Sequence, residues 1–411
     1  MQPQEISARK ILNSKGKETI SVIVKSQGKI FETSAPEGTS KGKYEVSALS
    51  EKGIDFSISL VNALGKKIVQ DKLIFCTFDD LEKLESLVKQ LDKTNNFSVI
   101  GGNSLYALEA SLLKAIAASY KQELWQFLLE NKKAQIPKPL GNCIGGGKHT
   151  EQELRPDFQE FLVMPRTEHF FDSYFINLQT YKETKSLLQK KDKTWQGTLT
   201  YENALASTMD NESILDLLQE VKEKIKEKYG IEILIGVDIA ADSLWQDSRY
   251  RYQNFKKEKP RTKLTEEAQL EYVRSIINKY NLFYVEDPFH DKAFESFSLL
   301  LKKTKNCLIC GDDLTCTHME LVKKTIDMKA INSLIVKPNQ VASLLETKKV
   351  IDFAKKNNIT LIISHRSGET YDNTIAHLAV GWQIPIIKTG ILGKERFAKL
   401  HELLRIERQL R

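Results

Sequence analysis

The chain is poor in cysteine. Its 411 residues include only five, Cys76, Cys143, Cys307, Cys310 and Cys316. Their spacing forms no disulfide framework, and Cys307 and Cys310 have no second pair with which to complete a zinc or redox site. Both also fall in an apolar, strand-like run, so two structural thiols are the favoured interpretation. This scarcity excludes a disulfide-stabilised secreted scaffold and predicts a reducing, cytoplasmic setting.

Long apolar runs are also missing. No stretch approaches the roughly 20 apolar residues that a membrane-spanning helix needs, and Met1 to Glu5 contains no apolar core of a signal peptide. A glycine-rich turn at 143–149 is no phosphate-binding loop, because Asn142 and His149 stand where that motif has Gly and Ser or Thr. We therefore expect no membrane span and no P-loop chemistry.

The chain has only a small excess of charge of one sign. Its 61 basic and 54 acidic residues leave a net charge of +7. The two signs alternate along segments such as 221–228, which is typical of a solvated helix face, so we expect no nucleic-acid partner. Hydrophobic content of 41% is that of an ordinary globular protein, and the length suits two domains or one large barrel with an addition.

The first 130 residues predict a small α+β domain. Residues 4–35 contain three short alternating runs separated by turns, which indicates a β-meander. Helical periodicity follows over 56–67, 79–91 and 103–129, with Asn103 or Ser104 as a candidate N-cap of the last helix. A proline-containing stretch at 131–139 then marks a boundary. We predict an N-terminal domain over 1–130 and a second domain over 136–411.

The second domain alternates apolar runs with helical segments, which predicts an α/β fold with parallel strands. Helices are expected over 170–190 and 211–229 and after Thr265, a candidate cap. Six apolar runs end in or beside a titratable residue. These residues are Asp238, Glu286, Asp312, Lys337, His365 and Lys388. Their successive spacings are 48, 26, 25, 28 and 23 residues, mostly one βα unit, and the first gap predicts extra structure.

Charged side chains at the carboxyl ends of parallel strands avoid the cost of burial in mid-strand. In a (β/α) barrel these ends meet at one rim, where catalytic groups gather. Three carboxylates, two lysines and one histidine are therefore predicted to converge. Three carboxylates suit a hard cation such as Mg²⁺. A lysine beside that cation is a candidate base with a lowered pKa.

At this point the motifs resemble those of the enolase family, the phosphopyruvate hydratases, nearly from end to end. Ser364 to Thr370 is the family signature as it stands, and Lys337 to Gln340 is similar to the family's Lys-Val-Asn-Gln. Residues 387–390 and 395–399 resemble its tail. Residues 237–241, 285–289 and 311–314 resemble its three metal-binding strands, and 146–149 and 157–161 match the early barrel.

The resemblance implies a (β/α)8-type enolase barrel with an N-terminal α+β capping domain, in a cytoplasmic homodimer. The implied reaction is the reversible dehydration of 2-phosphoglycerate to phosphoenolpyruvate, in glycolysis and gluconeogenesis, with two Mg²⁺ ions. Asp238, Glu286 and Asp312 would hold the first ion, and Ser40 would complete the second with the substrate phosphate. Lys337 would be the base and Glu202 the acid. The implied substrate contacts are His149, Glu160, Ser364, His365, Arg366, Ser367 and Lys388.

The chemistry of these residue types agrees with that reaction. A proton alpha to a carboxylate is a very weak acid, and two divalent cations on that carboxylate stabilise the ene-diolate. The leaving hydroxide needs an acid, for which a carboxyl group of raised pKa is suited. An arginine beside serines suits a phosphate.

The chain departs from the family pattern around the acid. The family has Gly-Asp-Glu-Gly-Gly, where this chain has Thr200-Tyr201-Glu202-Asn203-Ala204. Asn13 and Lys15 stand where the family favours Asp and Arg, and Gly145 replaces an asparagine. Two alternatives therefore remain open. One is an enolase-superfamily lyase that acts on another acid, and the other is a catalytically impaired paralogue with a binding or structural role.

Overall fold

The computed structural model describes residues 1–38, 42–130 and 132–411. The chain begins with an antiparallel sheet of β1 (Glu5–Leu12), β2 (Glu18–Ser26) and β3 (Lys29–Ser34), in the order β1-β2-β3. The predicted meander is thus confirmed. Its alternating apolar residues, such as Ile20, Val22 and Val24, are buried.

Four helices follow this sheet. They are α1 (Ile54–Gln70), α2 (Leu81–Leu91), α3 (Gly102–Ser119) and α4 (Leu124–Leu129). The single helix predicted over 103–129 is wrong, because the chain turns at Lys121, whose φ is +58°, and restarts as α4. The N-cap of α3 is Gly101, with φ of +86°, and neither Asn103 nor Ser104. A β-carbon at 101 would meet the backbone of Leu49, so this helix starts where only glycine fits.

The rest of the described chain contains a closed ring of eight strands. Pairing between the first and last strands closes the ring. In order round the ring the strands are β4 (Lys138–Gly145), β5 (Glu160–Pro165), β7 (Ile233–Asp238), β11 (Tyr284–Glu286), β12 (Leu308–Gly311), β13 (Ser333–Val336), β14 (Thr360–Ser364) and β15 (Ile386–Lys388). The predicted α/β barrel is therefore confirmed, and its six charge-ended strands lie side by side and parallel.

One strand of the ring runs the other way. β5 is antiparallel to both β4 and β7. Its first residue, Glu160, consequently pairs with Asp238, the last residue of β7, so both carboxylates lie at the same rim. Strand β6 (Leu205–Ala206) adds to β4 outside the ring.

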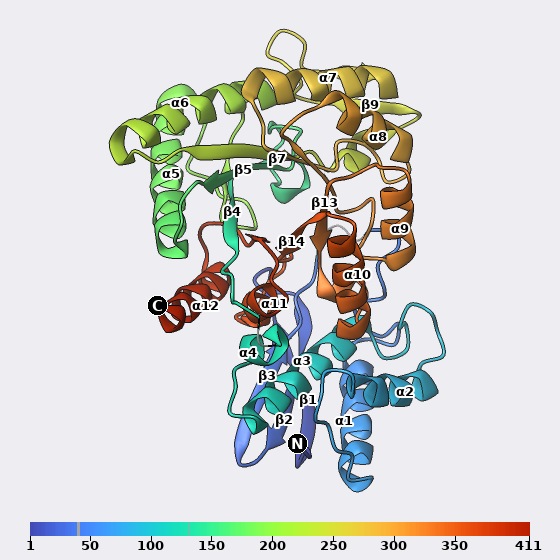
Figure 1. The fold of residues 1–411 in the computed structure, drawn as a ribbon. Helices are drawn as coiled ribbons and strands as arrows, with labels where there is room; N and C mark the ends of the chain where they lie inside the picture. Colours follow the sequence, from blue (N-terminus) through green and yellow to red (C-terminus); the bar gives the residue numbers. More distant parts are fainter. Residues whose placement is uncertain (39–41, 131) are drawn as a thin grey trace.

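Helices cover the outside of the ring (Figure 1). They are α5 (Phe170–Lys191), α6 (Asn211–Tyr229), α7 (Glu266–Tyr280), α8 (Phe294–Lys303), α9 (Met319–Asp327), α10 (Leu344–Lys356), α11 (Thr374–Gly381) and α12 (Lys394–Leu410). Thr265 caps α7 as predicted, accepting a hydrogen bond from the Ala268 amide. The long gap after Asp238 holds a small sheet of β8 (Trp245–Gln246), β9 (Arg249–Tyr252) and β10 (Thr262–Leu264), which is the predicted extra structure.

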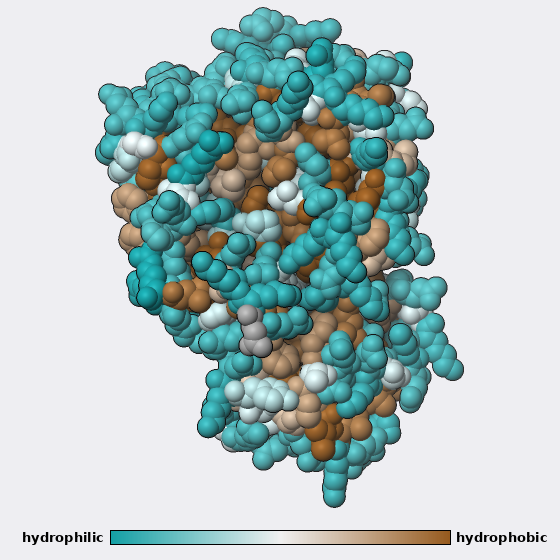
Figure 2. Space-filling model, in the orientation of Figure 1, coloured by the Kyte–Doolittle hydropathy of each residue, from teal (hydrophilic) through white to brown (hydrophobic). Residues whose placement is uncertain are grey.

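The interior of the ring is packed with side chains rather than open. Seven of its strands contribute one buried residue each to a single cluster. The cluster consists of Leu140, Leu162, Tyr284, Cys310, Ile335, Ile362 and Ile386. On the face drawn in Figure 2, hydrophilic side chains cover most of the surface, and hydrophobic ones show through in the middle. In the described part of the chain no helix has the length and apolar character to span a bilayer.

Candidate active site

A small pocket, open to solvent, lies where the barrel rim meets the N-terminal segment. Gly38 and Glu45 line it from the N-terminal side. The predicted site residues that line it are His149, Glu160, Glu202, Asp238, Asp312, Lys337, Ser364, His365, Arg366, Ser367 and Lys388. Glu286 is fully buried beside it and contacts Lys388. Ser40 lies outside the described residues. We call this feature the rim pocket.

Lys388 sits among three carboxylates. Its Nζ lies 3.0 Å from Glu160, 3.2 Å from Asp238 and 2.6 Å from Glu286. Burial would lower the pKa of this ammonium, but the attraction of Asp238 and its neighbours raises it well above its usual value. Burial and repulsion from Asp238 raise the pKa of Glu286 to about 8. One ammonium therefore does not neutralise the group.

Lys337 forms an ion pair with Asp312. Burial acts to lower the pKa of Lys337, but the charge of Asp312 outweighs it, and the pKa is raised. The prediction of a lowered pKa concerns a lysine beside a bound Mg²⁺ ion, and it stays a prediction. Between Lys337 and Asp312 themselves, the negative charge of Asp312 holds the proton on the amine.

Asp287, which the sequence interpretation missed, orders the loop that carries Asp312. Its carboxylate accepts hydrogen bonds from the amides of Asp312 and Asp313, at 3.0 and 2.7 Å. Ligand atoms of these three aspartates lie within 4.8 Å of one another. The sequence feature that could have identified Asp287 as a site residue is its position directly after Glu286, at the end of β11. Because its oxygens already serve two amides, we assign it to positioning Asp312.

The donor set fits a divalent cation. Glu286 Oε1 and Asp312 Oδ1 are buried, and neither has a hydrogen-bond partner among the described residues. Such atoms are costly to bury unless an ion or a donor satisfies them. The lining contains the acids Glu45, Glu160, Glu202, Asp238, Asp287, Asp312 and Asp313 against the bases Lys337, Arg366 and Lys388. An excess of carboxylates with free oxygens is what Mg²⁺ prefers.

Glu202 lies between two histidines. Its carboxylate is 3.9 Å from His149 Nε2 and 3.4 Å from His365 Nε2. Burial acts to raise the pKa of Glu202, but the two histidines lower it to well below its usual value. The prediction of a raised pKa is thus wrong, because the sequence could not show that both histidines face this carboxylate. Glu202 is nonetheless buried at the rim pocket, despite the changed residues around it.

Arg366 is held by a residue that the sequence interpretation also missed. Its guanidinium pairs with Glu45 at 2.9 Å and donates to Asn339 Oδ1 at 3.1 Å. Glu45 lies in the segment between β3 and α1, and nothing in its spacing marked it as a partner of a barrel residue. Lys15, another departure from the family pattern, lies 4.1 Å from the ring centroid of Tyr201, beside Glu202.

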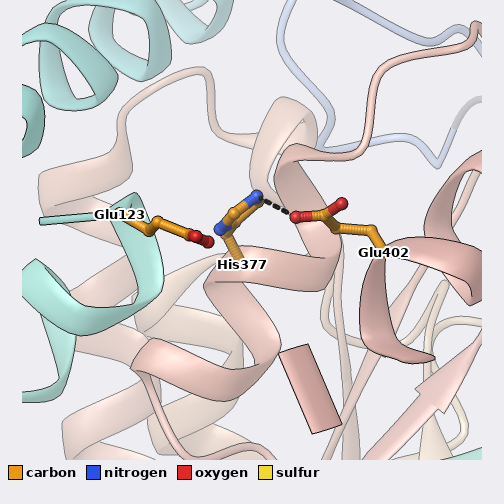
Figure 3. A group of neighbouring side chains, drawn as sticks. All are labelled: Glu123, His377 and Glu402. Atoms are coloured by element: carbon orange, nitrogen blue, oxygen red, sulfur yellow. Dashed lines mark ion pairs between the residues drawn. The ribbon is translucent and has the colours of Figure 1, made fainter. Parts of the chain in front are cut away.

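A second group of histidine and carboxylates lies away from the rim pocket. Glu123, before α4, and Glu402 in α12 flank His377 of α11, and His377 Nε2 is 3.0 Å from Glu402 (Figure 3). The guanidinium of Arg405 contacts both carboxylates, and its Nη1 lies 2.8 Å from Glu123 Oε1. We call these four residues the α4–α12 cluster. Because Arg405 occupies both carboxylates, the cluster ties α12 to the segment before α4 and leaves no ligand set free.

Comparison with known proteins supports one family. A model described as "Enolase, N-terminal domain" matches residues 4–128, and one described as "Enolase, C-terminal TIM barrel domain" matches 133–411. A protein named enolase from Methanosphaera stadtmanae is 39% identical over 409 residues, covering 99% of this chain and 97% of the relative. Enolases from Methanothermobacter thermautotrophicus and Archaeoglobus fulgidus are 38% and 35% identical, over 99% and 98% of this chain and 96% of each relative. With these matches and a rim pocket of this composition, the chain belongs to the enolase family.

Proposed function

We propose that the protein is an Mg²⁺-dependent enolase, a hydro-lyase that reversibly dehydrates 2-phosphoglycerate to phosphoenolpyruvate in glycolysis and gluconeogenesis. The observation that carries the proposal is the composition of the rim pocket, which joins two lysines and an arginine to a larger number of carboxylates. An acid-rich site suits divalent cations, and its three fixed cations suit a substrate that carries both a carboxylate and a phosphate.

Lys337 is the proposed base that removes the proton at C2. Its amine must be neutral to do so, and in this structure the pairing with Asp312 opposes that. Asp238, Glu286 and Asp312 are the proposed ligands of one Mg²⁺, and Ser40 with the substrate phosphate is proposed for a second. When bound, Mg²⁺ supplies the positive charge that stabilises the ene-diolate. A ligand role for Asp312 would also weaken its hold on the proton of Lys337.

Glu202 is the proposed acid for departure of the hydroxide. Because its pKa is lowered, its carboxylate alone is a poor source of a proton. We therefore propose that the proton comes from the pair Glu202 and His365, which lie 3.4 Å apart and can share one proton, with His149 nearby at 3.9 Å. The incoming negative charge of the substrate would raise the proton affinity of this group.

The remaining pocket residues are proposed to bind substrate. His149, Glu160 and Lys388 are assigned to its reacting end. Ser364, His365, Arg366 and Ser367 are assigned to its carboxylate and phosphate. Arg366 is paired with Glu45, so a phosphate at this position has to compete with that carboxylate. A phosphate carries more negative charge than the single carboxylate of Glu45, which favours the exchange.

The organisation of the chain is proposed from the same resemblance. We propose a division into an N-terminal capping domain over 1–130 and a catalytic barrel over 136–411, which is supported by the sheet of β1 to β3 and by the ring that begins at β4. We also propose a cytoplasmic homodimer without a nucleic-acid partner. Sedimentation equilibrium tests the dimer.

One assay tests the reaction. The purified protein is mixed with Mg²⁺ and 2-phosphoglycerate, and phosphoenolpyruvate is followed by its ultraviolet absorbance. We expect product with Mg²⁺ and none when EDTA is in excess. The matched control is Lys349→Ala, which removes an exposed lysine of α10 and should leave the rate unchanged. Absence of product while Mg²⁺ still binds would contradict the proposal and favour a lyase with another substrate or an inactive paralogue.

A further inference from the structure

The turn that carries Glu202 is closed by Thr200. The Thr200 amide donates to the carbonyl of Ala204 at 2.8 Å, and the Asn203 amide donates back to the carbonyl of Thr200 at 3.0 Å. Asn203 has φ of +64°, a left-handed conformation that asparagine tolerates better than most residues. The turn is therefore tight, although the flanking glycines of the family pattern are absent.

The hydroxyl of Thr200 forms a hydrogen bond with the backbone of Glu202, the proposed acid. Thr200 Oγ1 accepts hydrogen bonds from the amides of Glu202 and Ala204, both at 3.2 Å. Thr200 is 6% exposed, so water has little access to replace these bonds. A buried amide that loses its acceptor carries an energetic penalty, and the turn would move to relieve it. This hydroxyl therefore helps to hold the backbone of Glu202 in place.

The methyl group of Thr200 fills a space that exists because residue 145 is glycine. A β-carbon added at Gly145 would lie 2.6 Å from Thr200 Cγ2, but 3.5 Å from both Cβ and Oγ1 of the same residue. Gly145 is the last residue of β4 and pairs with Glu160 of β5 and Ala206 of β6. Any side chain here would push the turn away from the barrel rim.

We propose that Thr200 is a positioning residue for Glu202, and that its fit against Gly145 fixes the acid at the rim pocket. This inference rests on the proposed function, because it assumes that Glu202 takes part in dehydration. The hydroxyl fixes the conformation of the turn by accepting hydrogen bonds from two of its amides. The methyl group fixes the distance between the turn and β4. A displacement of about 1 Å is enough to reduce a catalytic rate by roughly a hundredfold.

Four variants separate the two contacts. Thr200→Val keeps the methyl group and the shape but removes the acceptor, whereas Thr200→Ser keeps the acceptor and removes the methyl group. Gly145→Ala introduces the clash. The double variant Gly145→Ala with Thr200→Ser removes the one atom that the new β-carbon would meet.

Two rates are measured for each variant with 2-phosphoglycerate and Mg²⁺: exchange of the C2 proton with solvent, and formation of phosphoenolpyruvate. We expect Thr200→Val to lower dehydration about tenfold and Gly145→Ala about a hundredfold, with exchange within twofold of the unaltered protein. Thr200→Ser should stay near the normal rate, and the double variant should recover most of the loss caused by Gly145→Ala. Retained exchange shows that each variant is folded.

Three results would overturn the inference. They are normal dehydration in both Thr200→Val and Gly145→Ala, an equal loss of exchange and dehydration in either, and no recovery in the double variant. Glu202→Gln is measured in parallel. If it dehydrates normally, the proposed function fails. If it is blocked while Thr200→Val and Gly145→Ala are normal, only the positioning role fails.

Discussion

Two parts of the molecule bring histidine and carboxylate side chains together, and they differ in how the negative charge is balanced. In the α4–α12 cluster, Arg405 contacts both Glu123 and Glu402, and His377 adds a further contact. In the rim pocket the carboxylates outnumber the lysines and the arginine, and buried oxygens of Glu286 and Asp312 lack a hydrogen-bond partner among the described residues.

This difference separates a structural cluster from a chemical one. Carboxylates that already pair with a guanidinium and stay partly open to water have less to gain from a metal ion. Glu286, which is buried where carboxylates outnumber cations, has a raised pKa and would gain from a divalent cation. Residue types alone therefore do not identify a metal site. Whether a group of carboxylates gains from binding a cation depends on the positive charge that already lies beside it.

The largest effect should come from removing the proposed base. We expect Lys337→Ala to lower exchange of the C2 proton and turnover together by about 10³-fold or more, since general-base catalysis contributes about 10² to 10⁴. Exchange is measured by the loss of deuterium from C2-labelled 2-phosphoglycerate. Lys349→Ala is the control. Exchange that persists in Lys337→Ala would remove this lysine as the base.

The next largest effect should separate exchange of the C2 proton from dehydration. We expect Glu202→Gln to lower dehydration by about 10²-fold while exchange continues, because the amide keeps the shape of the side chain but cannot pass a proton. Rates of both steps are measured under the same conditions. Unchanged product formation would indicate that a different group protonates the hydroxide.

Breaking the α4–α12 cluster should affect stability and not catalysis. We expect Glu402→Gln to lower the free energy of unfolding by about 1–2 kcal/mol, because Arg405 and His377 lose a half-buried partner. Urea unfolding gives the stability, and the phosphoenolpyruvate assay gives the activity. Glu130→Gln, at an exposed glutamate, is the control. A large loss of activity in Glu402→Gln would contradict the separation of the two regions.

The smallest effect should appear as a pH dependence. Burial acts to raise the pKa of Glu402, but contacts with His377 and Arg405 lower it to about 2. A lowered folded-state pKa gives stability that is present above the unfolded pKa of about 4.3 and is lost as pH falls towards 2. The stability difference between the unaltered protein and Glu402→Gln should therefore shrink by about 1 kcal/mol from pH 5 to pH 2.5. A stability difference that stays constant between pH 5 and pH 2.5 would contradict the lowered pKa of Glu402.

The sequence predicted the elements whose signals are local. The meander, the six parallel strands and the cap at Thr265 all follow from short-range patterns, and each is confirmed. The reversed strand β5 was not predicted, because an apolar strand carries no signal of its direction. The break between α3 and α4 was also missed, since Lys121 is not a residue type that marks a left-handed turn.

The convergence of the site residues could be predicted from the sequence by a geometric rule, whereas the charge states of these residues could not. Charged residues at the ends of parallel strands meet at one rim, so the placement of Asp238, Lys337 and Lys388 was predictable. The pKa values of Lys337 and Glu202 depend on Asp312 and on two histidines that are distant in the chain. Glu45 and Asp287 were missed because their roles exist only through contacts between loops.

The central claim is that the excess carboxylates of the rim pocket bind divalent cations and that the α4–α12 cluster does not. Calorimetric titration with Mg²⁺ in the presence of 2-phosphoglycerate tests it most directly, on the unaltered protein, Asp312→Asn and Glu402→Gln. The account predicts binding in the unaltered protein and in Glu402→Gln, and binding at least tenfold weaker in Asp312→Asn. Unchanged binding in Asp312→Asn, or its loss in Glu402→Gln, would contradict it.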